Sequence, residues 1–288
     1  MTTSRPRLAS VVIPAHNAEA FLSDAVRSVL DQTWRQLELI IVDDGSTDGT
    51  GPLADELRAA DDRIRVVHKP NGGLSSARNA GIAAAKGDAL SFLDADDAFL
   101  PEKLAHQMAF LEHFPGCDLV FSDYYIGDRD LTPIWLESVQ PPTDRMNDYV
   151  LFRNAFAPFC PLLRRRLVRA VGTFDETLRV SEDWDYWIRA AQVGKFSYLP
   201  GPVGVYRTHP QQMHHNHELM EATGRRLADR TFMRGSRRWR IMTASRLWAE
   251  GRRAPAGRRL LRTPIDLVRV CFVARSPRIV RNVLRWAR

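Results

Sequence analysis

The first half of the chain alternates short apolar segments with helix-like segments, and this order constrains the fold more than any other feature. Five segments have the length and apolar composition of buried strands: 8–14, 37–42, 64–68, 89–93 and 118–122. The segments between them read as helices, over 18–32, 48–60, 75–86 and 101–114. Strands that alternate with helices form a mainly parallel sheet covered by helices on both faces. The sequence therefore predicts an α/β fold.

The second half of the chain has a less regular pattern. Residues 144–156 and 184–193 are predicted to be helical, and residues 200–216, rich in Gly, Pro, His and Gln, are predicted to form a loop. From about Glu218 onward the pattern is again helical. We therefore expect a separate helical part at the end of the chain.

Charge divides the chain at about the same place. Residues 225–288 hold 19 Arg, no Lys and three acidic residues, a net charge of +16, which leaves −9 for residues 1–224 of a chain whose total is +7. A basic segment of this kind is a candidate for contact with anionic lipid or nucleic acid. Packing of the same helices on the rest of the protein, with the Arg faces exposed, explains the pattern equally.

Several classes of protein are disfavoured. Cys117, Cys160 and Cys271 are scattered and show no CxxC spacing, which indicates a reducing compartment and no structural zinc. The apolar run 8–15 is short and contains Pro14, so we expect no secretory signal and a cytoplasmic protein. The fingerprints GxGxxG and GxxxxGK[ST] are absent, which argues against the corresponding NAD(P) enzymes and P-loop enzymes.

Three carboxylates directly follow the apolar segment 89–93. Asp94 and Asp96 stand two residues apart, so at an extended strand end they point the same way. Mg²⁺ and Mn²⁺ bind through one or two carboxylates plus substrate phosphates, which suggests a nucleoside diphosphate ligand. A turn followed by a helix N-cap would also explain these residues.

Other polar segments are expected at the same edge of the sheet, because ligands of parallel sheets bind at the carboxyl ends of the strands. Each has a simpler explanation as a turn, a helix cap or a local ion pair. Their coincidence favours a binding site for an anionic ligand. The segments are Pro14-Ala15-His16-Asn17, Asp43-Asp44-Gly45-Ser46, and the Gly-rich stretch 71–79 with Gly73 and Arg78.

Five ordered motifs resemble those of family 2 glycosyltransferases of the GT-A fold, over roughly residues 8–210. They are VVIPAHN (11–17), IVDDGSTD (41–48), SARNAG (76–81), FLDADD (92–97), and VGTFDE (171–176) followed by SEDWD (181–185). The resemblance implies a Rossmann-like, mainly parallel mixed sheet in a catalytic domain over residues 1–222. Its donor half would cover about 1–122 and its acceptor half about 123–222, followed by an Arg-rich helical extension over 223–288.

The resemblance also implies a donor site for a nucleotide sugar. Pro14 and Asp44 would contact the nucleobase, Arg78 would lie near the base or the diphosphate, and Asp94 would face the ribose. Asp96 would bind Mn²⁺ or Mg²⁺ together with His209, and the metal would bridge the diphosphate. The remaining donor-site positions would be Ala15, His16, Asn17, Asp43, Gly45, Ser46, Gly73 and Ala95.

On the acceptor side, the resemblance makes Asp183 the general base of a single displacement that inverts the sugar's configuration. Glu182 and Asp185 are rival carboxylates, and a helix cap is the structural alternative for Asp183. Glu182, Trp184 and Asp97 are expected on the acceptor side, with Trp184 either stacking on a sugar or packing in the core. The acceptor would be a glycan or a lipid-linked glycan in cell-envelope or extracellular glycan assembly.

The C-terminal region departs from the processive members of this family. Gly235 stands where their Gln-x-x-Arg-Trp motif has Gln, and no membrane span follows, so a non-processive enzyme is expected. Residues 225–288 interleave Arg with apolar residues, as helices at a membrane interface do. We therefore expect peripheral contact with the inner face of the cell membrane, or packing of these helices on the catalytic domain. The oligomeric state stays open.

Two other functions remain compatible with the sequence. A nucleotidyltransferase can share a similar α/β nucleotide site, although the segments 174–176 and 182–183 favour sugar transfer. A non-catalytic adaptor could bind nucleic acid through the Arg-rich segment, with steeply salt-dependent affinity. The intact set of carboxylates makes a nucleic-acid partner the weaker expectation.

Overall fold

The structure, a computed structural model, describes residues 8–139, 146–150, 154 and 156–209, and the single positions 223 and 227. The chain forms two compact units, Met1–Gln140 with Phe156–His215, and Pro141–Ala155 with Asn216–Arg288. The helix predicted over 144–156 is described only as α5 (Met146–Tyr149), in the second unit. Apart from positions 223 and 227, the Arg-rich extension predicted for 223–288 lies outside the described residues.

The first unit is built on the parallel strands predicted from the sequence. β1 (Ala9–Ala15), β2 (Leu37–Asp43), β3 (Ile64–His68) and β4 (Ala89–Phe92) lie in the order β3-β2-β1-β4. β1, β2 and β4 are buried along their whole length, which explains why their sequences are apolar without alternation. In register, Ala15 faces Asp43 and Val12 faces Phe92, so the polar segments that follow these strands emerge at one edge.

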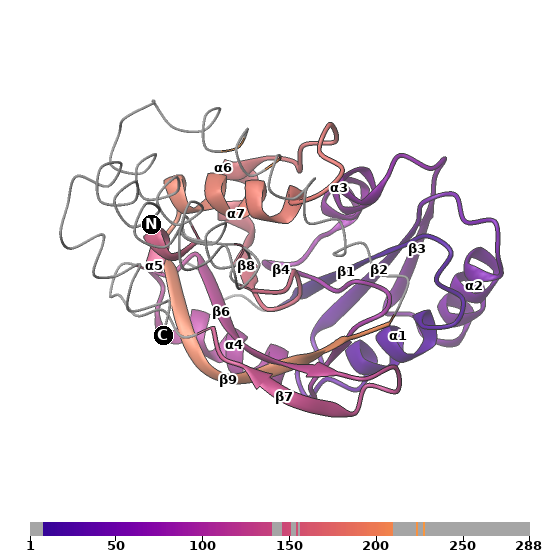
Figure 1. Cartoon of the computed structure of the whole chain (residues 1–288), viewed down its shortest axis with the longest axis horizontal. Helices are drawn as coiled ribbons and strands as arrows, with labels where there is room; N and C mark the ends of the chain where they lie inside the picture. Colours follow the sequence, from indigo (N-terminus) through magenta and orange to yellow (C-terminus); the bar gives the residue numbers. More distant parts are fainter. Residues whose placement is uncertain are drawn as a thin grey trace, which may run out of the picture. The chain divides into compact units, whose positions relative to one another are not determined.

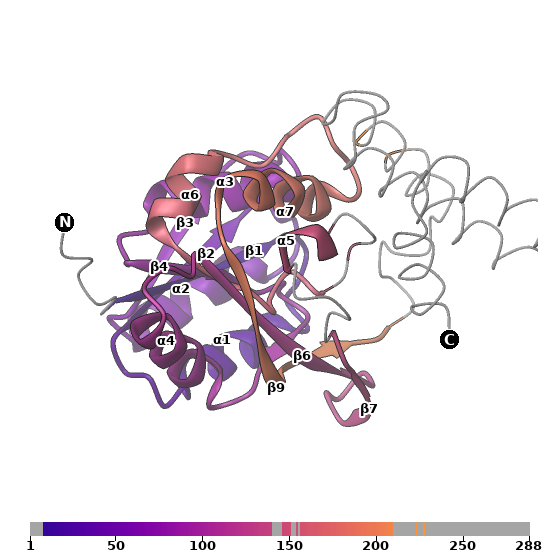
Figure 2. The ribbon, with the colours of Figure 1, turned by 90° about the vertical axis from the view of Figure 1, so that its left-hand side faces the viewer.

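Helices cover both faces of this sheet. α3 (Leu74–Ala84), α6 (Arg165–Val171) and α7 (Glu182–Val193) lie over one face, and α1 (Leu22–Leu30) and α4 (Lys103–His113) lie over the other (Figures 1 and 2). α2 (Thr50–Ala60) packs beside β2, β3 and α1. The α/β fold with helices on both faces is therefore confirmed. Among the described residues, no helix combines the length and apolar composition that a membrane crossing requires.

The other half of the sheet is mixed. It contains β5 (Ala98–Phe99), β6 (Leu119–Gly127), β7 (Pro133–Glu137), β8 (Leu162–Arg164) and β9 (Phe196–Arg207). β8 pairs antiparallel with both β4 and β6, whereas β6 and β9 are parallel. The full order is β3-β2-β1-β4-β8-β6-β9-β5, and β7 adds to β6 as a hairpin.

The sheet curls, and this curvature brings the end of β9 to the edge where β4 ends. β5 follows β4 after only residues 93–97, yet it pairs with β9 at the far end of the strand order, with Ala98 opposite Val205. Five residues span at most about 18 Å. The last residues of β9 must therefore lie close to the loop 93–97, which carries Asp94, Asp96 and Asp97.

The prediction of a loop over 200–216 is wrong for its first part, because β9 continues to Arg207. The Gly and Pro residues that suggested a loop mark irregular pairing instead. Gly201 has φ +110°, and the register between β6 and β9 shifts around Asp123. At Gly204 a Cβ atom would approach the ring of Phe159 to 2.5 Å, so only glycine fits there.

A buried polar network lies beneath β4. Lys103 on α4 is 1% exposed, and its Nζ donates to Oγ of Ser91 at 3.1 Å and to Oε1 of Gln107 at 2.7 Å. The ammonium group also lies over the ring of Phe99, 4.6 Å from its centroid. Burial lowers the pKa of Lys103 to about 7, and the nearby Cys160 opposes this only partly. Ser91 belongs to the strand that leads directly to Asp94.

Candidate active site

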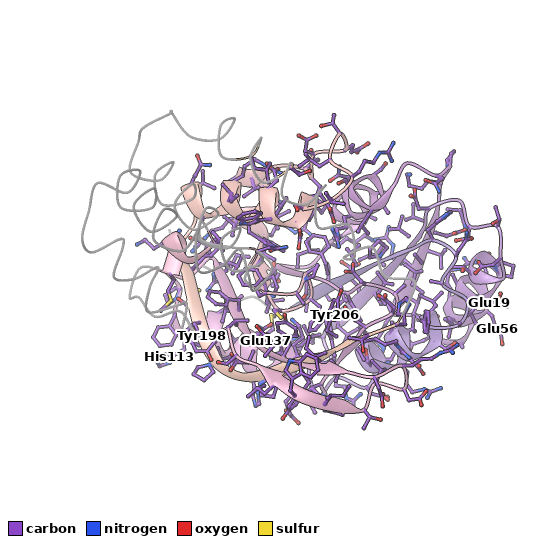
Figure 3. All side chains as sticks on the ribbon, viewed as in Figure 1. Glu19, Glu56, His113, Glu137, Tyr198 and Tyr206 are labelled. Carbon is purple, nitrogen blue, oxygen red and sulfur yellow. The ribbon has the colours of Figure 1, made fainter. Side chains whose placement is uncertain are left out.

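A pocket of about 1030 Å³ lies at the carboxyl edge of the sheet. Figure 3 labels two of its lining residues, Glu19 near α1 and α2 and Tyr206 on β9, so the pocket extends from the first strands to the end of β9. Most of the predicted donor-site residues line it: Pro14, Ala15, His16, Asn17, Asp44, Gly73, Asp94, Ala95 and Asp96, together with His209. The structure thus brings together five segments that are far apart in sequence.

Asp44 stands at one end of the pocket, which we call the nucleotide end. Its carboxylate accepts hydrogen bonds from Nζ of Lys69 (2.5 Å) and from the backbone N–H groups of Gly72 (3.0 Å) and Gly73 (2.7 Å). Gly73 has φ +87°, a left-handed conformation that aims its N–H at Asp44. Three donors thus already hold the Asp44 carboxylate, and its predicted contact with a base N–H stays a prediction.

His16 and Asn17 are fixed by neighbours in the same region. The His16 ring contacts the backbone oxygen of Asp44 through Nδ1 (3.1 Å) and the Asn71 amide nitrogen through Nε2 (3.1 Å). A carbonyl only accepts, so Nδ1 carries the proton and Nε2 accepts from Asn71. Asn17 accepts a hydrogen bond from the backbone N–H of Thr47 at 2.8 Å. Local contacts therefore shape this end of the pocket.

Asp43, Gly45 and Ser46 do not line the pocket, in contrast to the prediction that they bind the donor. Asp43 accepts from the backbone N–H of Ser46 at 3.0 Å and pairs with His68 at 3.0 Å. Burial acts to raise the pKa of Asp43, but these hydrogen bonds outweigh it and lower the pKa below its usual value. At Gly45 a Cβ would lie 2.7 Å from the backbone nitrogen of Asn71. These residues shape the turn that presents Asp44.

The other end, which we call the metal end, contains Asp96 and His209. Nε2 of His209 lies 3.0 Å from Oδ2 of Asp96, and the His209 ring stacks on Phe21 with centroids 5.0 Å apart. The Asp96 side chain is 28% exposed. A carboxylate and an imidazole fit a Mn²⁺ or Mg²⁺ site that takes its remaining ligands from donor phosphates. Among the described residues, no group of three or more His, Cys, Asp or Glu side chains forms a complete metal cage.

Arg207 connects the metal end to three other segments. Its guanidinium donates to the backbone oxygen of Asp96 (2.5 Å), to that of Arg129 in the β6–β7 turn, and to the carboxylate of Asp24 on α1 (3.0 Å). It also lies over the Phe21 ring, 4.9 Å from the centroid. Arg207 therefore holds the end of β9 against the loop that carries Asp96. His209 follows Arg207 by two residues, so it is held near Asp96 as well.

Asp97 was predicted to lie on the acceptor side. In the structure it is fully buried behind the pocket. Its Oδ1 accepts from the backbone N–H of Arg207 at 2.9 Å. Burial raises the pKa of Asp97 well above its usual value, and the charges of Asp96 and Asp94 raise it further. Because Asp97 follows Asp96 directly, its side chain turns away from the pocket that Asp96 faces, and it supports the loop from below.

The start of α7 presents the predicted general base. Ser181 precedes the helix in a left-handed conformation with φ +58°, and Asp183 accepts from the backbone N–H of Trp184 at 2.7 Å. Asp185 is 1% exposed and pairs with Arg189 at 2.8 Å, so this rival carboxylate is committed within the structure. Trp184 is buried, which favours packing, the second of the two alternatives for this residue.

Arg78 on α3 lies behind the pocket rather than in its lining. It is 1% exposed, and its two terminal nitrogens donate to Asp94 (2.8 Å) and to Glu182 (2.7 Å). Burial acts to lower its pKa, but the charges of Asp94, Glu182 and Asp183 outweigh this and raise it. Arg78 was predicted near the base or the diphosphate, and Glu182 on the acceptor side. In the structure both are buried and paired with each other, and neither lines the pocket.

Charge is distributed unevenly around the pocket. Among the described residues that line it, the only guanidinium or ammonium group belongs to Arg129. The lining carboxylates are those of Glu19, Asp44, Asp48, Asp94 and Asp96. An anionic diphosphate would be repelled by this lining, so it needs a cation between itself and the carboxylates.

Several residues of the site carried no signal in the sequence. Lys69, Arg129 and Arg207 lie outside the five motifs, and so do Tyr206 and Phe21. Each acts through a partner that the fold brings close, such as Asp44 for Lys69 and the Asp96 backbone for Arg207. The one available signal was position, because Tyr206 and Arg207 directly precede the segment that ends in His209.

The curled mixed sheet with its carboxylate-lined edge pocket has the GT-A architecture, as solved structures of that class confirm. The S. aureus TarS 1–349 complex with UDP-GlcNAc matches with a TM-score of 0.66 and 18% identity, over 87% of this chain and 77% of that one. The mannosyltransferase PcManGT from Pyrobaculum calidifontis, in complex with GDP-Man and Mn²⁺, matches with a TM-score of 0.58 and 17% identity, over 98% and 74%. At these identities the likeness shows the fold alone.

The chain belongs to glycosyl transferase family 2, whose family model matches residues 10–172. The uncharacterized glycosyltransferase EpsJ of Bacillus subtilis (strain 168) is 32% identical over 72% of this chain and 62% of its own length. The putative teichuronic acid biosynthesis glycosyltransferase TuaG of the same organism is 40% identical over 46% and 53%. The chain spans 35% to 65% of the length of the first curated relatives it matches.

Proposed function

We propose that this protein transfers one sugar from a nucleoside diphosphate sugar to an acceptor hydroxyl, with inversion at the sugar and with a divalent metal. The observation that carries the proposal is the convergence of carboxylates from two distant segments. Asp94 and Asp96 line the pocket, and Arg78 connects Asp94 to Glu182, directly before Asp183. One guanidinium therefore connects a donor-side carboxylate to the turn that carries the candidate base.

The donor would lie along the pocket with its base at the nucleotide end and its diphosphate at the metal end. Asp96 and His209 would hold Mn²⁺ or Mg²⁺, which supplies positive charge to the departing diphosphate. Arg129 is the exposed guanidinium that lines the same pocket and adds to this charge. Asp94 would face the ribose. The complexes of structural neighbours with UDP-GlcNAc and with GDP-Man support a nucleotide sugar as donor.

In the transfer step, Asp183 removes the proton of the acceptor hydroxyl while that oxygen attacks C1 of the sugar. The C1–O bond to the diphosphate breaks, and its electron pair leaves with the nucleoside diphosphate. Asp183 keeps the proton, and the product carries the inverted linkage. Glu182 is engaged in an ion pair with Arg78 at 2.7 Å, so the role of base is assigned to Asp183 rather than to Glu182.

The acceptor is proposed to be a glycan or a lipid-linked glycan of the cell envelope. The name of TuaG, a relative in teichuronic acid biosynthesis, supports this. Peripheral contact of residues 225–288 with an anionic membrane would bring the protein to such an acceptor. That segment lies outside the described residues, and the contact stays a prediction from its charge.

The test is thermal stability against a panel of nucleoside diphosphates and nucleotide sugars, with and without Mn²⁺. A ligand that binds the folded state raises the melting temperature. We expect a Mn²⁺-dependent rise with one nucleobase and, with its nucleotide sugar, release of the nucleoside diphosphate. Release of pyrophosphate would instead indicate a nucleotidyltransferase, and no shift with any member of the panel would contradict the proposal.

A further inference from the structure

Arg78 forms a bridge between the donor side of the pocket and the start of α7. Nη2 donates to Oδ1 of Asp94 at 2.8 Å, and Nη1 donates to Oε1 of Glu182 at 2.7 Å. The two carboxylates come from segments 88 residues apart in the chain. A planar guanidinium presents its donors in a fixed fork, so one side chain sets the separation and the orientation of both carboxylates.

The neighbouring residue on α3 fixes the same loop from another direction. The Asn79 side chain donates to the backbone oxygen of Phe174 at 3.0 Å and accepts from its backbone N–H at 2.7 Å. The Arg78 guanidinium lies over the Phe174 ring, 5.4 Å from its centroid. Two consecutive residues of α3 therefore hold the beginning and the end of the segment 174–182, which delivers Asp183.

The Arg78 guanidinium is engaged with carboxylates and withdrawn from solvent. Both terminal nitrogens are committed to carboxylates, and the side chain is 1% exposed. Arg129, in contrast, is exposed and lines the pocket. A diphosphate in the pocket would thus meet Arg129 directly and Arg78 only through Asp94.

We propose that Arg78 is a positioning residue that holds Asp94 and the Glu182–Asp183 turn in a fixed relation, and that it is not a ligand of the donor phosphates. This inference rests on the function proposed above. The bridge engages Glu182 with Arg78, and Asp183, the proposed general base, directly follows Glu182 in the same turn. It also places Asp183 relative to the donor side, because the same guanidinium holds Asp94 and Glu182, and Asp183 directly follows Glu182.

The experiment compares Arg78→Lys, Glu182→Gln and the double variant with wild type. Lysine keeps the positive charge but offers a single point of contact, so it cannot bridge both carboxylates. Binding of UDP or GDP, whichever the thermal panel selects, is measured by calorimetry with Mn²⁺. Turnover is measured as release of that diphosphate from the matching nucleotide sugar, with water as acceptor and donor saturating.

A positioning role predicts that Arg78→Lys lowers kcat by roughly 30-fold or more while Kd for the diphosphate changes by less than about threefold. The kcat of the double variant should lie within about twofold of the kcat of the slower single variant, because both changes break the same bridge. A Kd weakened about tenfold or more with kcat retained, or effects that multiply in the double variant, would overturn the inference.

The matched control is Arg189→Met. Arg189 pairs with Asp185 on α7 at 2.8 Å and donates to the backbone oxygens of Val171 and Thr173, so it supports the same loop without contact to the pocket carboxylates. We expect a lower melting temperature and a kcat within about threefold of wild type. If wild type binds no nucleotide at all, the proposed function fails. If wild type binds and turns over but the variants show the phosphate-ligand pattern, only the role of Arg78 fails.

Discussion

The two ends of the pocket are built in different ways. At the nucleotide end, the Asp44 side chain is 3% exposed and its three donors come from residues 25 to 29 positions away. At the metal end, the Asp94 and Asp96 side chains are 24% and 28% exposed. His209, the partner of Asp96, lies 113 residues away, and the Arg78 bridge reaches Glu182, 104 residues from Arg78.

This difference separates a preformed end from an incomplete one. The Asp44 carboxylate already has three hydrogen bonds, so the nucleotide end holds its shape before a ligand arrives. Asp94 and Asp96 face the pocket with lone pairs that ligand or metal can take. We therefore expect substitutions at the metal end, or of the general base Asp183, to change kcat and the dependence of turnover on the metal. Substitutions at the nucleotide end should change nucleoside affinity alone.

The largest expected effect is that of Asp183→Asn. Loss of a general base costs about 10²- to 10⁴-fold in kcat, while the diphosphate should bind with unchanged affinity because Asp183 does not line the pocket. Steady-state turnover and calorimetry measure the two quantities. Asp185→Asn is the control: it breaks the pair with Arg189 and should lower the melting temperature with little loss of kcat. Equal losses in both variants would remove Asp183 from its assigned role.

Asp96→Asn should have the next largest effect. The amide keeps the shape but loses the charge, and Mn²⁺ would lose its carboxylate ligand, with a loss of roughly 100-fold in metal-dependent turnover. Turnover measured across a Mn²⁺ titration should show a much higher half-saturating concentration. His209→Gln should shift the same titration in the same direction, since its ring lies 3.0 Å from Asp96. An unchanged Mn²⁺ titration in both variants would place the metal elsewhere.

Lys69→Met should affect the nucleotide end alone. The ammonium group holds Asp44, and its loss leaves the backbone amides of Gly72 and Gly73 as the recorded donors. Loss of a charged hydrogen-bond partner costs about 1.5–3 kcal/mol, reduced here by solvent because Lys69 is partly exposed. We expect about a fivefold weaker Kd for both the nucleoside and its diphosphate, by calorimetry. A loss confined to the diphosphate would show that Lys69 contacts phosphate instead.

The smallest effect on binding and turnover is expected for Lys103, which acts on stability through the strand that leads to Asp94. Burial lowers the pKa of Lys103 to about 7 in the folded protein, against about 10.4 in an unfolded chain. Between these pH values the unfolded state binds a proton that the folded state does not, so the free energy of unfolding rises with pH, by at most about 1.4 kcal/mol per unit. Below pH 7 Lys103 is protonated in both states, so the gain in unfolding free energy that deprotonation of the folded state provides is lost.

Denaturant unfolding of wild type and Lys103→Met at several pH values between 6.5 and 9.5 measures this effect. The difference in unfolding free energy between the two proteins should change in favour of wild type as pH rises. A difference that stays constant across this range would mean that Lys103 keeps its proton in the folded state. Nucleotide binding should be nearly the same in both proteins, because Lys103 does not line the pocket.

The comparison of the two ends also explains what the sequence could predict. The strands β1, β2 and β4 are continuous apolar runs, and the segments that follow them had to meet at one edge. Asp44, His16 and Asn17 were therefore predictable as pocket residues. Their contacts join segments one or two βα units apart, and such contacts follow from element order alone.

The metal end depends on the curl of the sheet, and that curl was not predictable from residue patterns. β5 is two residues long, and β9 contains the Gly and Pro residues that indicated a loop. Asp97 accepts a hydrogen bond from Arg207, 110 residues away, and Arg78 pairs with Glu182, 104 residues away, so neither contact follows from local sequence. The family resemblance named His209 and Asp183, but only the fold shows that α3 connects the donor side to Asp183.

The central claim is that the pocket has a preformed nucleoside end and a metal-dependent diphosphate end. The most direct test is a calorimetric titration of wild type with a nucleoside and with its diphosphate, each with and without Mn²⁺. The account predicts that Mn²⁺ tightens the diphosphate by about tenfold or more and leaves the nucleoside unchanged. Equal effects of Mn²⁺ on both ligands, or none on the diphosphate, would contradict it.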